Sequence, residues 1–255
     1  MKLIAILLFC CVNLLVLAQE SVSPIIIDSI ESQNLKQVRK FCLYLPPQFD
    51  SQREYPAIIA TDGQLIVEGN YAPVLDSLIR NKLTEPFVLI GAYSDETPAC
   101  GVMVRNLEYL RPEKKNKVAQ TYFNNHYRFF TKELVEKVLA KYRIKIHTPL
   151  VFYGCSNGGD FGLILYSQKE PMFTSYICLS PVSTQANDFK YNTRSRLYVA
   201  YGDEELVFPF GINLEDLSKK MQKYKGEGVF VQPYEGGHER KKWLFFFCSI
   251  LTELL

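Results

Sequence analysis

The sequence predicts an α/β fold with a mostly parallel sheet of roughly eight strands and helices on both faces. Apolar runs bounded by turn residues are typical of buried strands, and they fall at 57–60, 87–92, 150–153, 176–179, 197–201 and 229–232. Helical patterns alternate with these runs, at 74–79, 130–142, 214–224 and 243–255. Two earlier runs, 25–32 and 38–45, indicate an antiparallel pair at one edge of the sheet.

Residues 1–18 have the composition of a signal peptide and are left out of the fold prediction. Lys2 supplies a positive start, residues 4–17 are almost wholly apolar, and small residues precede an expected cleavage between Ala18 and Gln19. The apolar run is short for a membrane span, and the alternative is an uncleaved N-terminal anchor. We therefore expect an exported protein, periplasmic or secreted, whose residues 19–255 form a single domain with no stable membrane insertion.

Composition argues against several classes of function. The 255-residue chain has 29 Lys and Arg against 27 Asp and Glu, so its formal charge of +2 gives no net attraction to nucleic acid or anionic membranes. The cysteines beyond residue 18 are odd in number and scattered, which does not fit a disulfide framework. No Cys or His cluster has the spacing of metal ligands, so the sequence predicts no metal site.

The most informative motif is Gly154-Cys155-Ser156-Asn157-Gly158, a G-x-S-x-G pattern. It follows the apolar run 150–153 and precedes 161–166, which reads as a helix. In this strand–turn–helix setting the serine hydroxyl is exposed at the end of the sheet, and the glycines leave room for a strained turn. A helix starting at Asn157 would also offer free N–H groups to a developing oxyanion. We interpret Ser156 as a nucleophile; the alternative is a glycine-rich turn without chemistry.

A serine nucleophile needs a base. In α/β folds with the nucleophile on such a strand–turn–helix segment, the catalytic residues follow one another along the chain in the order serine, acid, histidine. Of the three histidines only His238 follows Ser156, in a loop after the predicted strand 229–232. The acid is one of Asp203, Glu204 and Glu205, which follow the strand 197–201 at the carboxyl edge of the sheet. Glu205 is the first choice and Asp203 the second.

The segment 94–120 shows neither a helical nor a strand period, and structureless loops of this length are uncommon unless they are functional or disordered. It follows the predicted strand 87–92, so we expect it over the carboxyl edge beside Ser156. It carries Arg105, Glu108 and Tyr109, which we interpret as substrate-facing side chains. The alternative is a variable surface loop.

These residues together resemble the Putative esterase family of α/β-hydrolases. That family includes enterobactin-type siderophore esterases, feruloyl and acetylxylan esterases, S-formylglutathione hydrolase and mycolyl transferases. The resemblance covers most of residues 19–255 and is carried by 41–47, 60–64, 105–109, 130–134, 154–159, 236–239 and Trp243. The Gly-Gly-His-Glu block at 236–239 and the Asp-Gly-Gln turn at 62–64 are more specific than the serine motif alone.

The resemblance implies the α/β-hydrolase fold, with Ser156 as nucleophile and His238 as base. It implies an oxyanion hole made by the backbone N–H of Asn157 and that of Gln64 or Gly63. The family's acid commonly falls three residues after the strand-ending glycine, which implies Glu205. Arg240 stands where relatives often have an aromatic residue, a difference at the rim of the expected site.

The sequence therefore predicts an exported serine carboxylic-ester hydrolase that uses a Ser-His-acid triad, an acyl-enzyme intermediate and no cofactor. Its partner would be a small-molecule or carbohydrate-linked ester, such as a feruloyl, acetyl or siderophore-type ester. Three alternatives stay open: an acyltransferase with the same residues, a serine peptidase, and a non-catalytic ligand-binding relative. The sequence makes no prediction about the oligomeric state or the acyl and alcohol parts of the substrate.

Overall fold

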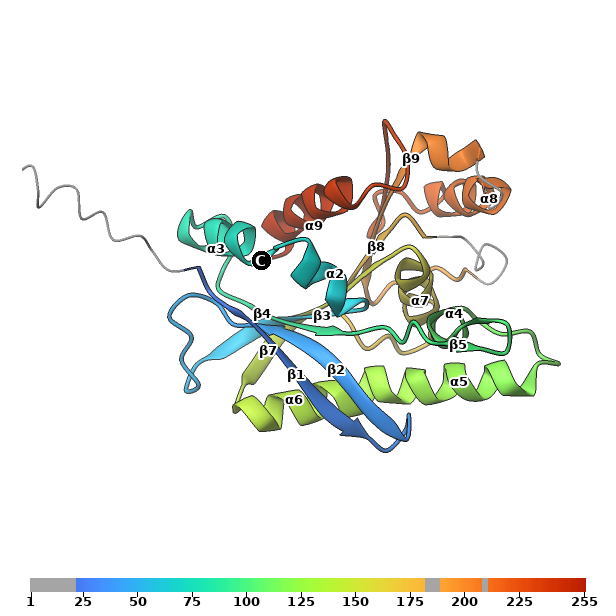
Figure 1. The fold of residues 1–255 in the computed structure, drawn as a ribbon. Coiled ribbons are helices and arrows are strands. Elements are labelled where there is room, and N and C mark those ends of the chain that lie inside the picture. The colour runs from blue at the N-terminus through green and yellow to red at the C-terminus, as the bar shows by residue number, and fades with distance from the viewer. Residues whose placement is uncertain (1–21, 182–188, 208–210) are drawn as a thin grey trace, which may run out of the picture.

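The computed structural model describes residues 22–181, 189–207 and 211–255 (Figure 1). The expected signal peptide and its cleavage site at Ala18 lie outside the described residues. In the described part of the chain, no helix is long and apolar enough to cross a membrane.

An eight-stranded sheet with the order β1-β2-β4-β3-β7-β8-β9-β10 forms the centre of the molecule. Neighbouring strands from β4 to β10 pair in parallel, whereas β2 pairs antiparallel with both β1 and β4. This confirms the predicted parallel sheet with an antiparallel pair at one edge. The strands are β1 (Ile25–Ser32), β2 (Gln37–Tyr44), β3 (Glu54–Ala60), β4 (Val88–Ala92), β7 (Lys145–Cys155), β8 (Ser175–Leu179), β9 (Arg196–Gly202) and β10 (Val229–Tyr234).

Helices cover both faces of the sheet (Figure 1). Helices α2 (Gly63–Glu68), α3 (Ala72–Arg80) and α9 (Arg240–Leu254) pack on one face. The other face is covered by α5 (Lys117–Arg128), the π-helical turn η1 (Phe129–Glu133), α6 (Leu134–Tyr142), α7 (Asn157–Tyr166) and α8 (Gly211–Gln222). Alternate residues of a strand face opposite sides, so Phe152 of β7 joins the α5–α7 core and Tyr153 stacks on Phe247 of α9 at 4.1 Å between ring centroids.

Two elements are longer than the sequence predicted. β7 extends from Lys145 to Cys155 rather than over 150–153, because residues 145–149 are mostly polar and the apolar pattern does not include them. The helix predicted over 130–142 begins at Lys117 and continues through η1 into α6. The extra residue of a π-helical turn shifts the phase of the apolar pattern, which explains why the pattern identified only the second half.

The segment 94–120 is not structureless. It contains a short hairpin of β5 (Pro98–Ala99) and β6 (Val102–Met103), then α4 (Val104–Tyr109), then the start of α5. The Asn116 side chain caps α5 by accepting a hydrogen bond from the Ala119 N–H at 3.0 Å. Elements of two to six residues are too short to show a period, so the pattern could not identify them.

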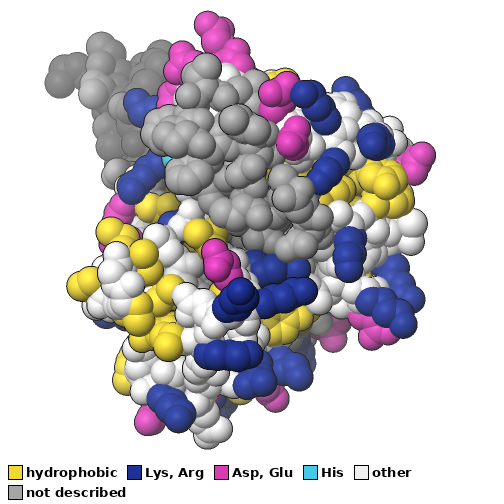
Figure 2. Space-filling view, turned by 90° about the vertical axis from the view of Figure 1, so that its right-hand side faces the viewer, with side chains coloured by type: hydrophobic (Ala, Val, Ile, Leu, Met, Phe, Trp, Pro, Cys, Tyr) yellow, Lys and Arg dark blue, Asp and Glu magenta, His cyan; other side chains and the backbone are white. Residues whose placement is uncertain are grey.

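The surface carries both signs of charge. Figure 2 shows acidic, basic and hydrophobic side chains interspersed over one face, with Lys and Arg gathered near its middle. This mixture accords with the small formal net charge of +2.

Candidate active site

Ser156 occupies a strained turn between β7 and α7. Its backbone has φ 57° and ψ −127°, a region that residues other than glycine rarely adopt. The turn is held on both sides: the Ser156 N–H donates to the Leu179 carbonyl at 2.9 Å, and the Ser156 carbonyl accepts from the Asp160 N–H at 3.1 Å. The sharp turn that the G-x-S-x-G motif predicts is therefore present at the carboxyl end of β7.

The glycines of this turn allow a close approach to the turn that follows β3. A Cβ atom on Gly158 would lie 2.2 Å from Thr61 Oγ1 and 2.9 Å from Asp62 Oδ2. A Cβ atom on Gly154 would lie 2.5 Å from the Gly158 carbonyl oxygen. Both positions therefore require glycine, and the segment around Ser156 packs directly on residues 61–62.

His238 is hydrogen-bonded to Glu205. The distance from His238 Nδ1 to Glu205 Oε2 is 2.8 Å, and the imidazole side chain is 43% exposed while the carboxylate is 10% exposed. Glu205 Oε1 accepts three more hydrogen bonds, from the Gly202 N–H at 2.8 Å, the Ser180 hydroxyl at 2.7 Å and the Tyr234 hydroxyl at 3.5 Å. Burial alone would raise the pKa of Glu205, but the hydrogen bonds from His238, Ser180 and Gly202 outweigh it and lower that pKa. Glu205 is therefore an ionised carboxylate facing an accessible imidazole.

Asp203 has a different role in the same turn. Its Oδ1 accepts a hydrogen bond from the Gly236 N–H at 3.0 Å, which ties the end of β9 to the loop before His238. The Glu204 N–H donates to the Gly236 carbonyl at 3.1 Å and strengthens this connection. Of the three acidic side chains, Glu205 is the one that contacts the imidazole.

Two residues behind this pair had no part in the sequence-based site. Ser180 follows directly after β8. Its hydroxyl accepts a hydrogen bond from the Trp243 indole N–H at 2.8 Å and donates one to Glu205 Oε1. The Trp243 ring also meets the His238 ring edge to face, at 4.8 Å between centroids and 89° between planes. A signal for Ser180 existed in the sequence, because a polar residue at the carboxyl end of a parallel strand is a candidate site residue.

The turn after β3 lies on the other side of Ser156 from Glu205, because β3 and β9 lie on opposite sides of β7 in the sheet. Asp62 has left-handed backbone angles, φ 54° and ψ 48°, and Gly63 and Gln64 follow as the first residues of α2. The Gln64 side chain is held by Ser94, whose N–H donates to Gln64 Oε1 at 3.2 Å. The first N–H groups of a helix have no partner within it, so those of Gly63, Gln64 and Asn157 are candidate donors to a ligand near Ser156.

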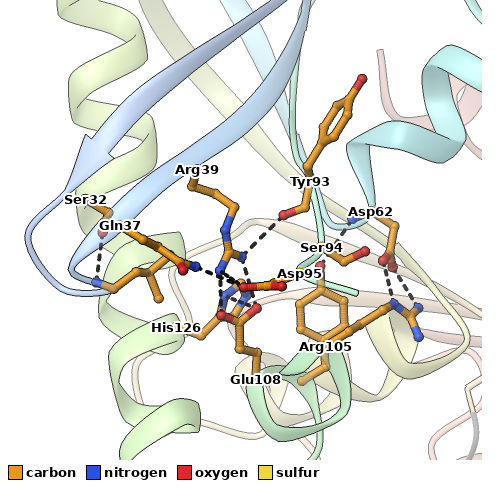
Figure 3. A network of polar contacts seen from close by, with 12 residues as sticks. Ser32, Gln37, Arg39, Asp62, Tyr93, Ser94, Asp95, Arg105, Glu108 and His126 are labelled. Atoms are coloured by element: carbon orange, nitrogen blue, oxygen red, sulfur yellow. Dashed lines mark hydrogen bonds and ion pairs between the residues drawn. The ribbon is translucent and has the colours of Figure 1, made fainter. Parts of the chain in front are cut away.

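The residues predicted to face substrate are instead engaged within the protein. Arg105 makes two hydrogen bonds to Asp62, Nε to Oδ1 at 2.6 Å and Nη2 to Oδ2 at 2.9 Å (Figure 3). Glu108 is 1% exposed and pairs with Arg39 of β2, and Tyr109 is fully buried. This corrects the sequence interpretation for Glu108 and Tyr109, which are buried, because a single sequence cannot show which polar side chains have an internal partner. The Arg105 side chain is 16% exposed and is paired with Asp62.

A cavity of about 140 Å³ lies between α2 and the start of α9. Its walls include Cys155, which precedes Ser156, and Trp243, which contacts His238. Tyr71 and Tyr153 also line it, and their hydroxyls are hydrogen-bonded to each other at 3.0 Å. Burial raises the pKa of both phenols and of the Cys155 thiol, so these groups are neutral.

The rim of the cavity carries charge. Arg240 of α9 and Glu68 of α2 form an exposed ion pair at 2.8 Å, and both line the cavity. In the described ranges, no group of three or more His, Cys, Asp or Glu side chains could hold a metal ion.

Comparison with known proteins identifies the family. The family described as Putative esterase matches residues 32–254 of this chain. Comparison with curated proteins finds no match. Among solved structures, an IroE-like serine hydrolase from Shewanella oneidensis superposes with a TM-score of 0.69 at 17% identity, covering 90% of this chain and 80% of that one.

Two further solved structures share the fold. A ferulic acid esterase superposes with a TM-score of 0.69 at 14% identity, covering 91% of this chain and 97% of that one. The enterobactin esterase from Shigella flexneri superposes with a TM-score of 0.71 at 17% identity; this chain is covered to 90% but spans only 58% of that longer protein. At these identities the likeness shows the α/β-hydrolase fold.

Proposed function

Because the chain belongs to the Putative esterase family, we propose that it is an exported serine carboxylic-ester hydrolase with Ser156, His238 and Glu205 as its catalytic triad. The observation that carries this proposal is the His238–Glu205 hydrogen bond at the carboxyl edge where Ser156 stands on its strained turn. The apolar segment before Ala18 supports export to the periplasm or the exterior.

The proposed reaction has two steps. The Ser156 hydroxyl oxygen bonds to the ester carbonyl carbon while His238 Nε2 takes the hydroxyl proton. The tetrahedral intermediate then releases the alcohol, which receives that proton from His238, and leaves an acyl group on Ser156. Water attacks the acyl carbon by the same route, and the products are a carboxylic acid and free Ser156.

Each surrounding group has a defined task in this scheme. Glu205 accepts a hydrogen bond from the Nδ1–H of His238, so the ring presents an unprotonated Nε2 to Ser156 and its cation is stabilised after proton transfer. The N–H groups of Asn157 and of Gln64 or Gly63 would hold the negative oxygen of the tetrahedral intermediate. No step needs a metal ion or a cofactor.

The local geometry supports Glu205 rather than Asp203 as the acid. Asp203 uses its carboxylate to hold Gly236, and its place in the turn is explained by that bond. The Glu205 carboxylate accepts a hydrogen bond from the Gly202 N–H and is hydrogen-bonded to the His238 imidazole. A three-residue offset from the strand-ending glycine is long enough for this return.

The cavity between α2 and α9 supports a compact substrate group. An apolar cavity of similar volume holds a benzene molecule, so we propose that a neutral part of the ester of about this size, such as an acetyl group or an aromatic ring, enters here. Tyr71, Tyr153 and Cys155, which line part of this cavity, are neutral, so burying a charged group against them would be costly. Acetyl, feruloyl and siderophore-type esters are the candidate classes.

The test is an assay of purified residues 19–255 against short acyl, feruloyl and macrolactone esters, with Ser156→Ala as the matched inactive variant. We expect hydrolysis of at least one class by the wild type and a fall of roughly 10⁴–10⁶ in turnover for the variant. Hydrolysis at wild-type rates by folded Ser156→Ala would contradict the proposal. Transfer of the acyl group to an added alcohol in preference to water would identify an acyltransferase instead.

A further inference from the structure

We propose that α4 acts as a clamp that positions both sides of the oxyanion site. The clamp consists of two neighbouring residues: Arg105 holds the turn at 61–64, and Asn106 holds Asn157. Both are positioning residues, since they act through the groups that would touch substrate. This inference rests on the proposed hydrolase function and extends it to residues that lie outside the triad.

The first arm of the clamp is the Arg105–Asp62 ion pair. The guanidinium makes a two-bonded contact with the carboxylate, at 2.6 Å and 2.9 Å, and the side chains are 16% and 3% exposed. Burial would lower the pKa of Arg105, but the hydrogen bonds to Asp62 outweigh it and raise that pKa, so the guanidinium stays charged. Two parallel hydrogen bonds fix the orientation of a carboxylate as well as its position.

Asp62 needs this support because of its backbone. A left-handed conformation is uncommon for residues other than glycine, and Asp62 adopts it at φ 54° and ψ 48° immediately before Gly63 and Gln64. The Asp62 N–H also points to the Tyr109 hydroxyl, at 3.4 Å, so α4 contacts both the backbone and the side chain of this residue. The directions of the Gly63 and Gln64 N–H groups therefore depend on Asp62, which α4 holds in place.

The second arm is the hydrogen bond between two asparagines. Asn157 Nδ2 donates to Asn106 Oδ1 at 2.8 Å. Asn157 follows Ser156 directly, and its backbone N–H is the other proposed oxyanion donor. Because Arg105 and Asn106 are adjacent on one short helix, the relative position of the two donors depends on α4.

The helix itself is anchored to the sheet (Figure 3). Glu108 forms a two-bonded pair with Arg39 of β2, at 2.7 Å and 3.0 Å, and the two side chains are 2% and 4% exposed. Tyr109 stacks on Phe161 of α7 at 5.8 Å between centroids. Buried charges that are fully paired hold one geometry strongly, because separating them would leave a charge without a partner. The clamp is therefore a rigid support built on β2 and α7.

The atoms that bond within the protein give Arg105 and Asn106 their positioning role. Arg105 uses Nε and Nη2 on Asp62, and Asn106 uses its carbonyl oxygen on Asn157. Oxyanion donors contribute most in the transition state, where the charge develops. Loosening the clamp should therefore lower kcat and the affinity for transition-state analogues, with little effect on KM.

The experiment compares Asn106→Leu, Asn106→Asp and Arg105→Lys. The leucine variant removes the acceptor for Asn157, the aspartate variant keeps an acceptor oxygen, and the lysine variant keeps the charge but loses the two-bonded contact. The readouts are kcat, KM, the pH profile of kcat and inhibition by a phenylboronic acid. A boronic acid forms a tetrahedral adduct with Ser156 that resembles the intermediate, so its affinity reports on the oxyanion site.

We expect Asn106→Leu and Arg105→Lys to lower kcat and boronate affinity together, by about 10- to 100-fold, because a misplacement near 1 Å has an effect of this order. KM should change less than about twofold, since ground-state contacts are kept. The pH profile should keep its midpoint, because His238 and Glu205 are untouched. Asn106→Asp should recover most of the activity.

The matched control is Arg80→Ala, which removes the arginine of a similar ion pair with buried Asp76 on α3, far from α4 in the fold (Figure 1). It should lower the melting temperature without changing boronate affinity. If folded Asn106→Leu and Arg105→Lys keep wild-type kcat and boronate affinity, or raise KM alone, the clamp proposal is wrong. Failure of the hydrolase proposal would be seen separately, as full activity in Ser156→Ala.

Discussion

Replacing Glu205 with glutamine separates the shape of this side chain from its charge. In the structure Oε1 accepts from the Gly202 N–H, while Oε2 faces His238 Nδ1 at 2.8 Å. A backbone N–H can only donate, so the amide oxygen of glutamine should take the Oε1 position and the amide nitrogen the Oε2 position. That nitrogen then donates to Nδ1, and the ring is left with its proton on Nε2, where it cannot accept the proton of Ser156.

The expected loss is about 10⁴ in kcat, or about 5 kcal/mol of transition-state stabilisation, the effect of holding the wrong imidazole tautomer. The Gly202 and Ser180 hydrogen bonds persist, so the melting temperature should fall little. Asp203→Asn is the matched control; its amide oxygen can still accept from the Gly236 N–H, so kcat should fall less than about tenfold, the effect of one weakened hydrogen bond.

The assay is the initial rate of 4-nitrophenyl acetate hydrolysis by each variant, with circular dichroism to establish that each is folded. Glu205→Gln with more than about a tenth of wild-type kcat would refute the tautomer argument, which requires a much larger loss. The opposite ranking, with Asp203→Asn the more damaged, would refute the assignment of the acid.

Three further outcomes follow from the packing, the cavity and a buried carboxylate. Gly158→Ala should lower both kcat and the melting temperature, since its Cβ would lie 2.2 Å from Thr61 Oγ1 and overpacking costs roughly 1–3 kcal/mol; an active variant of unchanged melting temperature would contradict this. Leu244→Trp should fill the cavity and reduce hydrolysis of benzoyl-sized esters more than acetyl esters, and equal effects on both would contradict the subsite. Burial opposes ionisation of Glu133, yet hydrogen bonds from Lys137 and Ser32, among others, lower its pKa from 4.5 to about 2. A lowered pKa stabilises the fold above pH 4.5, and this contribution, up to about 3 kcal/mol, is lost as the pH falls toward 2. Urea unfolding between those pH values should therefore show a flatter pH dependence for Glu133→Gln.

The features that could be predicted from sequence are those that depend on residues adjacent in the chain. Strands β3, β4 and β7 to β10 contain apolar runs bounded by turn residues. The turn at Ser156 is specified by Gly154 and Gly158, where a side chain would collide with neighbouring atoms. The contact between Glu205 and His238 agrees with the offset argument from Gly202, while the catalytic roles of these residues are predictions for the experiments above.

The features that could not be predicted depend on partners distant in sequence. Arg105 meets Asp62 across 43 residues, and Glu108 meets Arg39 across 69, so nothing in the local pattern of 94–120 indicates which charges are buried. His126 of α5 is fully buried among aromatic rings, where burial lowers its pKa well below the usual value. A short helix such as α4 is stabilised by such tertiary contacts rather than by periodicity.

The most direct test of the central claim is covalent labelling of the protein with a fluorophosphonate probe, followed by mass mapping of the modified residue. We expect one label per chain on Ser156, fast in the wild type, slow in His238→Gln and absent in Ser156→Ala. The phosphonyl group reports on nucleophilic activation alone, so the result does not depend on the identity of the natural ester. No labelling of the folded wild type, or labelling that survives in Ser156→Ala, would contradict the claim that this turn carries an activated serine.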